Sequence, residues 1–422
     1  MLLGAITDDF TGATDLCSML VRGGMRTVQL IGLPRPNDPV PDADAVVVAL
    51  KSRTAPVRLA VDESVAALAW LRAAGCRQFF FKYCSTFDST EEGNIGPVAD
   101  ALIAALGCGF ALACPAFPAN ARSVYQGYLF VGGTLLNESG MEHHPLTPMT
   151  DANLVRVLSR QTDGTVGLVP YATVEQGAMA IRQAMTALKE QGRRYAIIDA
   201  VSDTHLLAIG EAAEHHPLIT GGSGVAMGLP ANFVRAGHLP PGGDAASLPA
   251  VTGHAAVLAG SCSRATLAQL GAARETLPVL QLDPIGQPDI GRMVATAQEW
   301  MADKLGATPI VIAASAPPDK VATLQRMLGR DGAGALIEQT LALIAEDLVM
   351  RGVRRLVVAG GETAGAVVSR LGVRSLHIGA EIDPGVPWTY AEGGASPLLL
   401  ALKSGNFGAR DFFTKAFEVL ND

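Results

Sequence analysis

A chain of 422 residues is too long for one ordinary hydrophobic core, so two domains are expected. With 49% hydrophobic residues and 17% charged residues, its composition fits a globular enzyme with packed α/β layers. The net charge of −8, without clustered Lys and Arg, argues against a nucleic-acid partner. The six cysteines show no CxxC spacing, which argues against a zinc site or a disulfide framework.

The first apolar stretch is interrupted by Asp8 and Asp9 before a secretion signal could form. No apolar run reaches the roughly 18 residues that would indicate a membrane span. We therefore expect a cytoplasmic protein with no membrane partner. The sequence leaves its oligomeric state open, a homodimer included.

Short apolar strands alternate with helical segments through the first half of the chain. This βαβ rhythm predicts a mainly parallel sheet covered on both faces. The expected strands are Met1–Ile6, Thr27–Leu33, Ala45–Leu50, Gln78–Tyr83, Phe110–Cys114, Thr165–Val169, Tyr195–Asp199 and Leu218–Thr220. The expected helices are Ala13–Val21, Val57–Ala74, Asn94–Ala105, Thr173–Gln191 and Asp203–Glu214.

A segment rich in Pro, Gly and Ala, residues 236–253, has no amphipathic period and is typical of an interdomain linker. It separates an expected first domain, residues 1–235, from a second, residues 254–422. There the α/β rhythm restarts, with expected strands Ala255–Leu258, Val279–Leu282, Ile310–Ala313, Leu356–Ala359 and Leu398–Leu402 and a helix Ala335–Arg351. The predicted fold class is two α/β domains with mainly parallel sheets and a ligand cleft between them.

The stretch ITDDFTGATD places Asp8 and Asp9 between the end of the first strand and the start of the following helix. In an open α/β sheet, this carboxyl edge is where ligands bind. One acid there would simply cap the helix, with an effect of about 1 kcal/mol. Two adjacent acids, followed by a hydroxyl and a glycine that leaves room, favour a polyol or magnesium site.

Polar side chains also follow later strands of the first domain. The loop after the strand Gln78–Tyr83, residues 82–98, is dense in hydroxyl groups and charges. Such a loop suits a ligand rich in hydroxyls and carboxylate, although a solvated loop is the alternative. Arg53 offers a two-pronged bond to a carboxylate, although an arginine after a strand more often makes a surface ion pair. The candidate substrate-binding residues are Ser52, Arg53, Lys82, Ser85, Thr86, Asp88, Asn120 and Arg122.

Three glycine-bearing turns each follow a strand of the second domain: AGSCSRAT, AGGETAGAV and KSGNFG. In the first, Ser261 and Ser263 offer hydroxyls and backbone N–H groups to phosphates. In the second, Gly360 and Gly361 let the backbone approach an anion, and Glu362 is available for magnesium or a ribose. Together they predict a nucleotide-phosphate cradle. The chain has neither a GxxxxGK[ST] P-loop nor a GxGxxG fingerprint, so neither a P-loop NTPase nor a dinucleotide enzyme is indicated.

The chain resembles the four-carbon acid sugar kinase family over nearly its whole length, in the stretches ITDDFTGATD, KYCSTFDSTEEGNIGP, PAFPANAR, LAGSCSRATLAQ and VAGGETAGAVV. Within that family, the stretch KYCSTFDST looks most like the branch that phosphorylates 3-oxo-tetronates. The resemblance implies an acid-sugar domain followed by a nucleotide domain with ATP as phosphoryl donor. It also implies ATP contacts on Ser261 or Ser263, on the loop from Gly360 to Thr363, and on Gly405.

The hypothesis that follows is a kinase that uses ATP and Mg²⁺ to phosphorylate the 4-hydroxyl of a 3-oxo-tetronate. In it, Asp8 or Asp9 receives the hydroxyl proton, and Arg53 and Lys82 hold the substrate carboxylate. The glycine loops hold the triphosphate. Kinases of D-erythronate or L-threonate share the same frame and remain an alternative. A more remote one is a non-catalytic acid-sugar sensor, although no DNA-binding module is visible.

Overall fold

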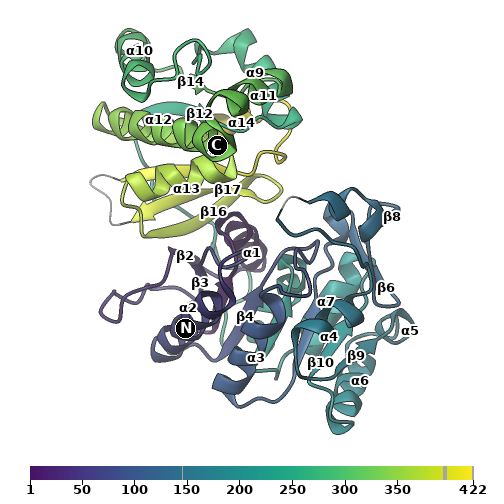
Figure 1. The fold of residues 1–422 in the computed structure, drawn as a ribbon. Coiled ribbons are helices and arrows are strands. Elements are labelled where there is room, and N and C mark those ends of the chain that lie inside the picture. Colours follow the sequence, from purple (N-terminus) through teal and green to yellow (C-terminus); the bar gives the residue numbers. More distant parts are fainter. Residues whose placement is uncertain (145, 393–396, 421–422) are drawn as a thin grey trace. The chain divides into compact units, whose positions relative to one another are not determined.

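The chain divides into two units of alternating strands and helices, Met1–Ala246 and Ser247–Asp422 (Figure 1). The computed structural model describes residues 1–144, 146–392 and 397–420. In each unit, most neighbouring strands of the main sheet are parallel, which confirms the predicted α/β class. Across the described ranges, no helix is both long and apolar enough to cross a membrane.

The main sheet of the first unit has the strand order β2-β3-β1-β4-β11-β5-β10-β9, with every neighbouring pair parallel. β3 shows why these segments form inner strands. Its sequence AVVVA contains three β-branched valines and is fully buried, as expected for parallel strands covered on both faces. The strands are β1 (Leu3–Thr7), β2 (Thr27–Ile31), β3 (Ala45–Ala49), β4 (Gln78–Lys82), β5 (Ala111–Cys114), β9 (Val166–Val169), β10 (Tyr195–Ile198) and β11 (Leu218–Gly221).

Helices connect these strands, and α3 packs against both α2 and α4. The predicted helix over residues 173–191 is wrong in one respect, because the chain forms two helices there. Gly177, with φ of 88°, breaks the run between them. The helices are α1 (Phe10–Arg22), α2 (Val57–Ala73), α3 (Ile95–Leu106), α4 (Leu154–Gln161), α5 (Tyr171–Val174), α6 (Ala178–Glu190), α7 (Asp203–Ala212) and α8 (Pro230–Arg235).

A small antiparallel sheet in the first unit was not predicted. Its strands β6 (Arg122–Tyr125), β7 (Tyr128–Val131) and β8 (Thr134–Leu135) follow one another in the chain. The buried Asp199 carboxylate, just after β10, accepts hydrogen bonds from the backbone N–H groups of Gln126 and Gly127 in the β6–β7 turn. This pairing ties the small sheet to the carboxyl edge of the main sheet.

The second unit has the strand order β13-β14-β12-β15-β18-β17-β16, parallel except for the pairs that β17 makes. The antiparallel hairpin of β16 and β17 was not predicted. The strands are β12 (His254–Ala259), β13 (Val279–Gln281), β14 (Ile310–Ala313), β15 (Val353–Ala359), β16 (Ser375–Asp383), β17 (Val386–Glu392) and β18 (Leu398–Lys403).

The helices of the second unit pack in two groups. α12 packs against α10, α11 and α13, whereas α9 packs against α14. The buried core between the sheet and the second group includes Leu270, Trp388 and Phe412. The helices are α9 (Arg264–Thr276), α10 (Ile290–Ala302), α11 (Pro318–Leu328), α12 (Arg330–Met350), α13 (Gly361–Arg370) and α14 (Phe412–Glu418).

Candidate active site

Strand register brings the polar loops of the first unit to one edge. In the parallel sheet, Thr7 at the end of β1 pairs with Ala49 at the end of β3 and with Lys82 at the end of β4. The residues that follow these strands therefore leave the sheet side by side. The Asp8–Asp9 segment and the loop after β4 therefore lie on one edge of the sheet.

Arg53 is the centre of a carboxylate cluster at this edge. Its Nε lies 2.8 Å from Asp8 Oδ2 and its Nη2 lies 3.1 Å from Asp8 Oδ1, which makes a two-pronged pair. The same Nη2 lies 3.0 Å from Asp9 Oδ2, and Nη1 lies 3.5 Å from Asp88 Oδ2. Most of the guanidinium donors are thus directed at the chain's own carboxylates, and the predicted hold on a substrate carboxylate stays a prediction.

Asp9 serves as the N-cap of α1, since its Oδ1 accepts the Gly12 N–H at 2.9 Å and its Oδ2 accepts the Thr11 hydroxyl at 3.2 Å. The buried Lys82 ammonium lies 3.6 Å from Asp9 Oδ1. A Cβ atom on Gly12 would lie only 1.7 Å from Lys82 Nζ. Glycine at this position therefore leaves the room that the ammonium fills.

The two adjacent acids differ in exposure and in pKa. Burial is the main influence on Asp8 and raises the pKa of its carboxyl above the ordinary value, although Arg53 opposes the shift. Burial acts the same way on Asp9, but the charges of Lys82 and Arg53 outweigh it and lower the Asp9 pKa. The Asp9 side chain is 30% exposed, whereas that of Asp8 is 6% exposed. Asp9 is thus the carboxylate that is both ionised and reachable.

The remaining predicted residues near this edge, Thr86, Ser52 and Ser85, lie around the cluster. The Thr86 hydroxyl donates to Asp88 Oδ1 at 2.6 Å, which orients that acid toward Arg53. Ser52 is buried, and its backbone N–H donates to the Asp8 carbonyl at 3.1 Å. Ser85 is half-buried in the loop after β4. The cavity lined by Asp8, Arg53 and Asp88 measures only about 10 Å³, which is too small to hold an acid sugar.

Asn94, which precedes α3, was not among the predicted site residues. Its buried Nδ2 donates to the carbonyls of Ser52, Arg53 and Ala55 at 2.7, 3.3 and 2.9 Å. One amide group therefore fixes the loop that presents Arg53. No local sequence signal marks this role, because the bonds reach back about forty positions along the chain.

Replacing Asn94 by alanine is expected to lower the free energy of unfolding by about 1–3 kcal/mol, because buried carbonyls lose their donor. It should also lower turnover, because the Arg53 loop loses its anchor. Denaturant unfolding and steady-state kinetics measure the two effects. Asn153→Ala, which removes the N-cap of α4, is the matched control and should cost about 1 kcal/mol with normal turnover. Equal kinetics in both variants would contradict the anchoring role.

In the part of the chain that the structure describes, Asn120 and Arg122 are not bonded to the cluster around Arg53. Asn120 ends a short 3₁₀ turn after β5, Arg122 begins β6, and the Arg122 guanidinium donates to the Asn120 carbonyl. Within the described residues, no hydrogen bond or ion pair joins either of them to Asp8, Asp9 or Arg53. Their predicted part in substrate binding stays a prediction.

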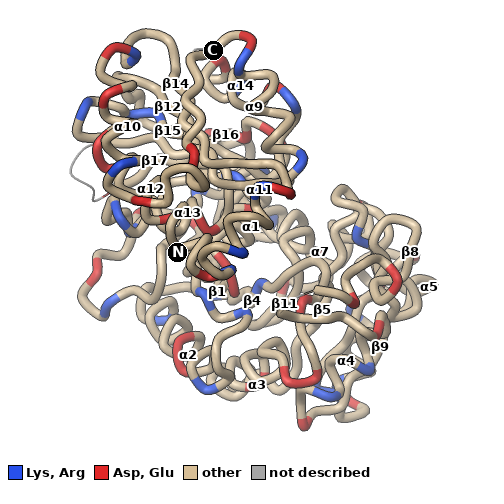
Figure 2. Tube along the Cα trace, turned by 45° about the horizontal axis from the view of Figure 1, so that its top comes forward, with Lys and Arg blue, Asp and Glu red and all other residues tan. Residues whose placement is uncertain are grey.

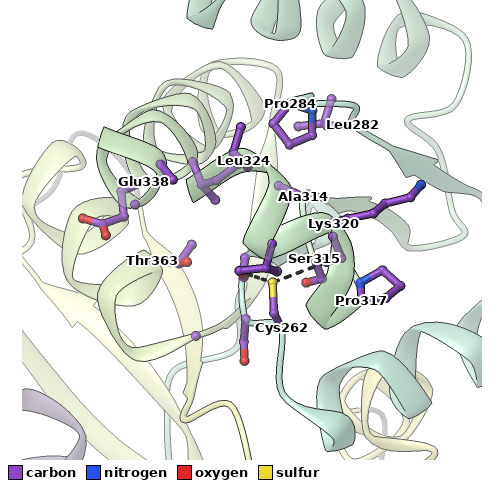
Figure 3. Close-up of a pocket in the computed structure, with 18 of the residues that line it drawn as sticks. Cys262, Leu282, Pro284, Ala314, Ser315, Pro317, Lys320, Leu324, Glu338 and Thr363 are labelled. Atoms are coloured by element: carbon purple, nitrogen blue, oxygen red, sulfur yellow. Dashed lines mark hydrogen bonds between the residues drawn. The ribbon is translucent and has the colours of Figure 1, made fainter. Parts of the chain in front are cut away.

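The second unit contains a cavity of about 890 Å³ (Figure 3). Five of the predicted nucleotide residues line it: Ser261, Gly360, Gly361, Glu362 and Thr363. The rest of the wall was not predicted. It combines apolar side chains around α11, α12 and β14, such as Leu282, Pro284, Ala314 and Leu324, with charged ones such as Lys320, Arg330 and Glu338. A large pocket lined by both apolar and polar side chains fits a nucleoside together with its phosphates.

The other two predicted nucleotide residues, Ser263 and Gly405, stand behind the cavity wall. Ser263 is the N-cap of α9, and its hydroxyl donates to the Gly405 carbonyl at 2.5 Å. A Cβ atom on Gly405 would lie 2.4 Å from Ser261 Oγ, so the loop after β18 packs closely on the loop after β12. The structure thus brings together the loops that carry Ser261 and Gly405.

Several polar residues of this cavity were not predicted, and two of them are Ser315 and Cys262. The Ser315 hydroxyl is buried in the wall and has no hydrogen-bond partner among the described residues. The Cys262 thiol, drawn at the centre of Figure 3, accepts the Ala316 N–H at 3.4 Å and so joins the ends of β12 and β14. Ser315 belongs to no motif, and Cys262 lies within the AGSCSRAT turn, in which only the serines were predicted to bind phosphates.

Charges are otherwise dispersed. Figure 2 shows Lys and Arg interspersed with Asp and Glu along both units. Among the described residues, no group of three or more His, Cys, Asp or Glu side chains is arranged to hold a metal ion by itself.

Family models match both halves of the chain. A sugar-binding N-terminal domain matches residues 3–229, and a nucleotide-binding C-terminal domain matches residues 256–413. A 3-oxo-tetronate kinase from Burkholderia multivorans is 58% identical over 424 residues, covering 100% of this chain and 97% of the relative. The chain belongs to the 3-oxo-tetronate kinase family. The predicted resemblance to four-carbon acid sugar kinases is confirmed.

A second relative and two solved structures are also similar to this chain over nearly its whole length. The enzyme of that name from Cupriavidus necator is 59% identical over 423 residues, with 99% of this chain and 97% of the relative covered. A solved Salmonella typhimurium LT2 structure, provisionally described as a tRNA synthase, is 44% identical with a TM-score of 0.90 and 98% coverage of both chains. A Haemophilus influenzae structure is 43% identical with a TM-score of 0.83, covering 99% of this chain and 100% of the other.

Proposed function

We propose that this protein transfers the γ-phosphoryl group of ATP to the 4-hydroxyl of a 3-oxo-tetronate. The observation that carries the proposal is the presence, in one chain of this family, of a charged edge suited to a small hydroxylated anion and a large cavity with glycine loops suited to a nucleotide. Phosphoryl transfer needs placement and charge stabilisation more than covalent help, and these two sites supply both.

Asp9 is the proposed acceptor of the hydroxyl proton. It is partly exposed, and Lys82 and Arg53 keep it ionised, so it can orient the hydroxyl and take its proton as the bond to phosphorus forms. Asp8, whose two oxygens are bound by Arg53, is proposed to hold the guanidinium in place instead.

The triphosphate is proposed to lie against Ser261 and the loop from Gly360 to Thr363, with the adenine ring against apolar side chains of the cavity such as Leu282 and Leu324. Mg²⁺ in kinases is usually held by one or two carboxylates together with substrate phosphates and water. Glu362, in the polar part of the cavity wall, fits that need as a single carboxylate. When bound, the ion would neutralise charge on the transferring phosphoryl group.

An ATP-consumption assay over four acids tests the proposal: both enantiomers of 3-oxo-tetronate, D-erythronate and L-threonate. One 3-oxo-tetronate should be preferred over the two hydroxy acids by at least about 10²-fold in kcat/KM, because a site built for one oxygen pattern leaves polar groups unpaired with another. Product NMR should place the phosphate on the 4-oxygen. Faster use of D-erythronate or L-threonate would favour the alternative kinases. Acid-sugar binding without ATP consumption would favour a sensor.

A further inference from the structure

Lys403, the last residue of β18, is a buried lysine without a counter-charge. Its side chain is fully excluded from solvent. The other buried lysine, Lys82, lies 3.6 Å from the Asp9 carboxylate. By contrast, no carboxylate in the described part of the chain lies within ion-pair distance of the Lys403 ammonium. Burying an uncompensated ammonium is costly, so this position calls for an explanation.

The contacts of Lys403 point to the nucleotide loops. Its Nζ donates to the carbonyls of Ser404 and Gly405, both at 3.0 Å, and to the Thr266 hydroxyl at 3.2 Å. Its own backbone carbonyl accepts the Gly360 N–H at 2.8 Å. One residue thus ties together the loop after β18 and the loop after β15.

These two loops meet the cavity. Gly360 lines it directly, and Gly405 packs against Ser261, which also lines it. The Lys403 ammonium therefore lies just behind the surface that would face the phosphates. Its three bonds go to neutral oxygens, so its positive charge is not cancelled by them.

We propose that Lys403 is the buried positive charge of the nucleotide site, a positioning residue that holds the Gly405 loop and stabilises bound phosphate groups electrostatically without touching them. The inference rests on the proposed nucleotide site and deepens it. The missing counter-charge is then the polyphosphate of the nucleotide, which supplies in the bound state what the fold lacks in the free state.

The electrostatic environment agrees with this assignment. Burial lowers the pKa of Lys403 to about 8, and burial is the only cause of the shift. Arg264 and Glu362, which begin or lie in the first turn of the flanking helices α9 and α13, make no bond to it, and no charged group on β15 or β17 contributes. A polyanion brought near would favour the protonated form and raise this pKa again. Nucleotide binding above pH 8 should therefore take up protons.

Calorimetric titration of the full-length protein with ATP and with adenosine tests the proposal. In Lys403→Met, ATP affinity should fall by about 10- to 100-fold, the range for loss of one charge at a few ångströms in a partly buried site. Adenosine affinity should be unchanged, because adenosine carries no phosphate. Lys304→Met, which removes an exposed lysine of the same unit, is the charge-matched control and should bind ATP normally.

A second readout uses the wild type alone. At pH 9, titrations with ATP in buffers of different ionisation heat should show proton uptake that is absent with adenosine, and Lys403→Met should abolish it. This measurement stands even where the variant does not fold. Equal loss of ATP and adenosine affinity, or wild-type ATP affinity in Lys403→Met, would overturn the inference. Failure of the wild type to bind ATP at all would instead overturn the proposed nucleotide site.

Discussion

Asp9→Asn is expected to lower kcat by about 10²- to 10⁴-fold, the usual effect of removing a general base. Asparagine caps a helix as well as aspartate does, so the hydrogen bond from the Gly12 N–H to the side chain at position 9 should survive. The loss would then report the missing carboxylate charge. Steady-state kinetics with saturating ATP, at a temperature where circular dichroism shows a folded variant, measure it.

Asp8→Asn is the matched variant, because it removes the same charge from the surroundings of Arg53 and Lys82. If Asp9 takes the proton and Asp8 holds Arg53, Asp8→Asn should reduce kcat less than Asp9→Asn does. The reverse order would exchange the two roles. Full turnover in Asp9→Asn would exclude Asp9 as the base.

The pH dependence of activity tests the role of Asp9 independently of the substitutions. A base must be deprotonated to act, and the lowered pKa of Asp9 moves the loss of that form to more acidic solution. From this carboxylate, activity should therefore show no acid limb above about pH 5. An acid limb near neutral pH, lost in Asp8→Asn, would instead point to the raised pKa of Asp8.

Gly12→Ala is expected to lower kcat by about 10²-fold and the free energy of unfolding by about 1–3 kcal/mol. The added Cβ would lie 1.7 Å from Lys82 Nζ and 2.2 Å from Asp9 Oδ1, so both side chains would have to move. A small displacement of a positioned carboxylate is enough to lose most of its catalytic effect. Kinetics and thermal unfolding measure the two consequences.

Gly271→Ala is the control for that substitution. Gly271 lies in α9, and a Cβ there would meet no atom within 4 Å. The change should stabilise the protein by about 0.5–1 kcal/mol, because alanine is the better helix former. Wild-type kcat and stability in Gly12→Ala would mean that Lys82 does not occupy the space next to α1.

The sequence predicted those parts of the fold and site that depend on local patterns. Runs such as AVVVA mark buried parallel strands, because such strands have no polar face. Polar residues at or just after the ends of parallel strands lie on one edge of the sheet, and Asp8, Arg53 and Lys82 do so. The glycine turns were visible for the same reason, since each follows a strong strand signal.

What the sequence did not reveal depends on contacts between distant residues. Asn94 looks like any residue before a helix, and its role arises only from the carbonyls of Ser52 and Ala55. Lys403 ends an apolar strand, and burial without a partner cannot be read from that position. The β16–β17 hairpin turns at Pro384 and Gly385, a short turn signal that was not used to predict it, and its register is irregular.

The bonds of Asn94 determine when the carboxylate cluster around Arg53 can form. The loop from Ser52 to Ala55 cannot take its final shape until the start of α3, some forty residues later in the chain, has docked on it. A nascent or truncated chain that ends before α3 would contain Asp8, Asp9, Arg53 and Lys82 without the arrangement that relates them. The arrangement of these charged side chains is thus a property of contacts between segments that lie far apart in the chain.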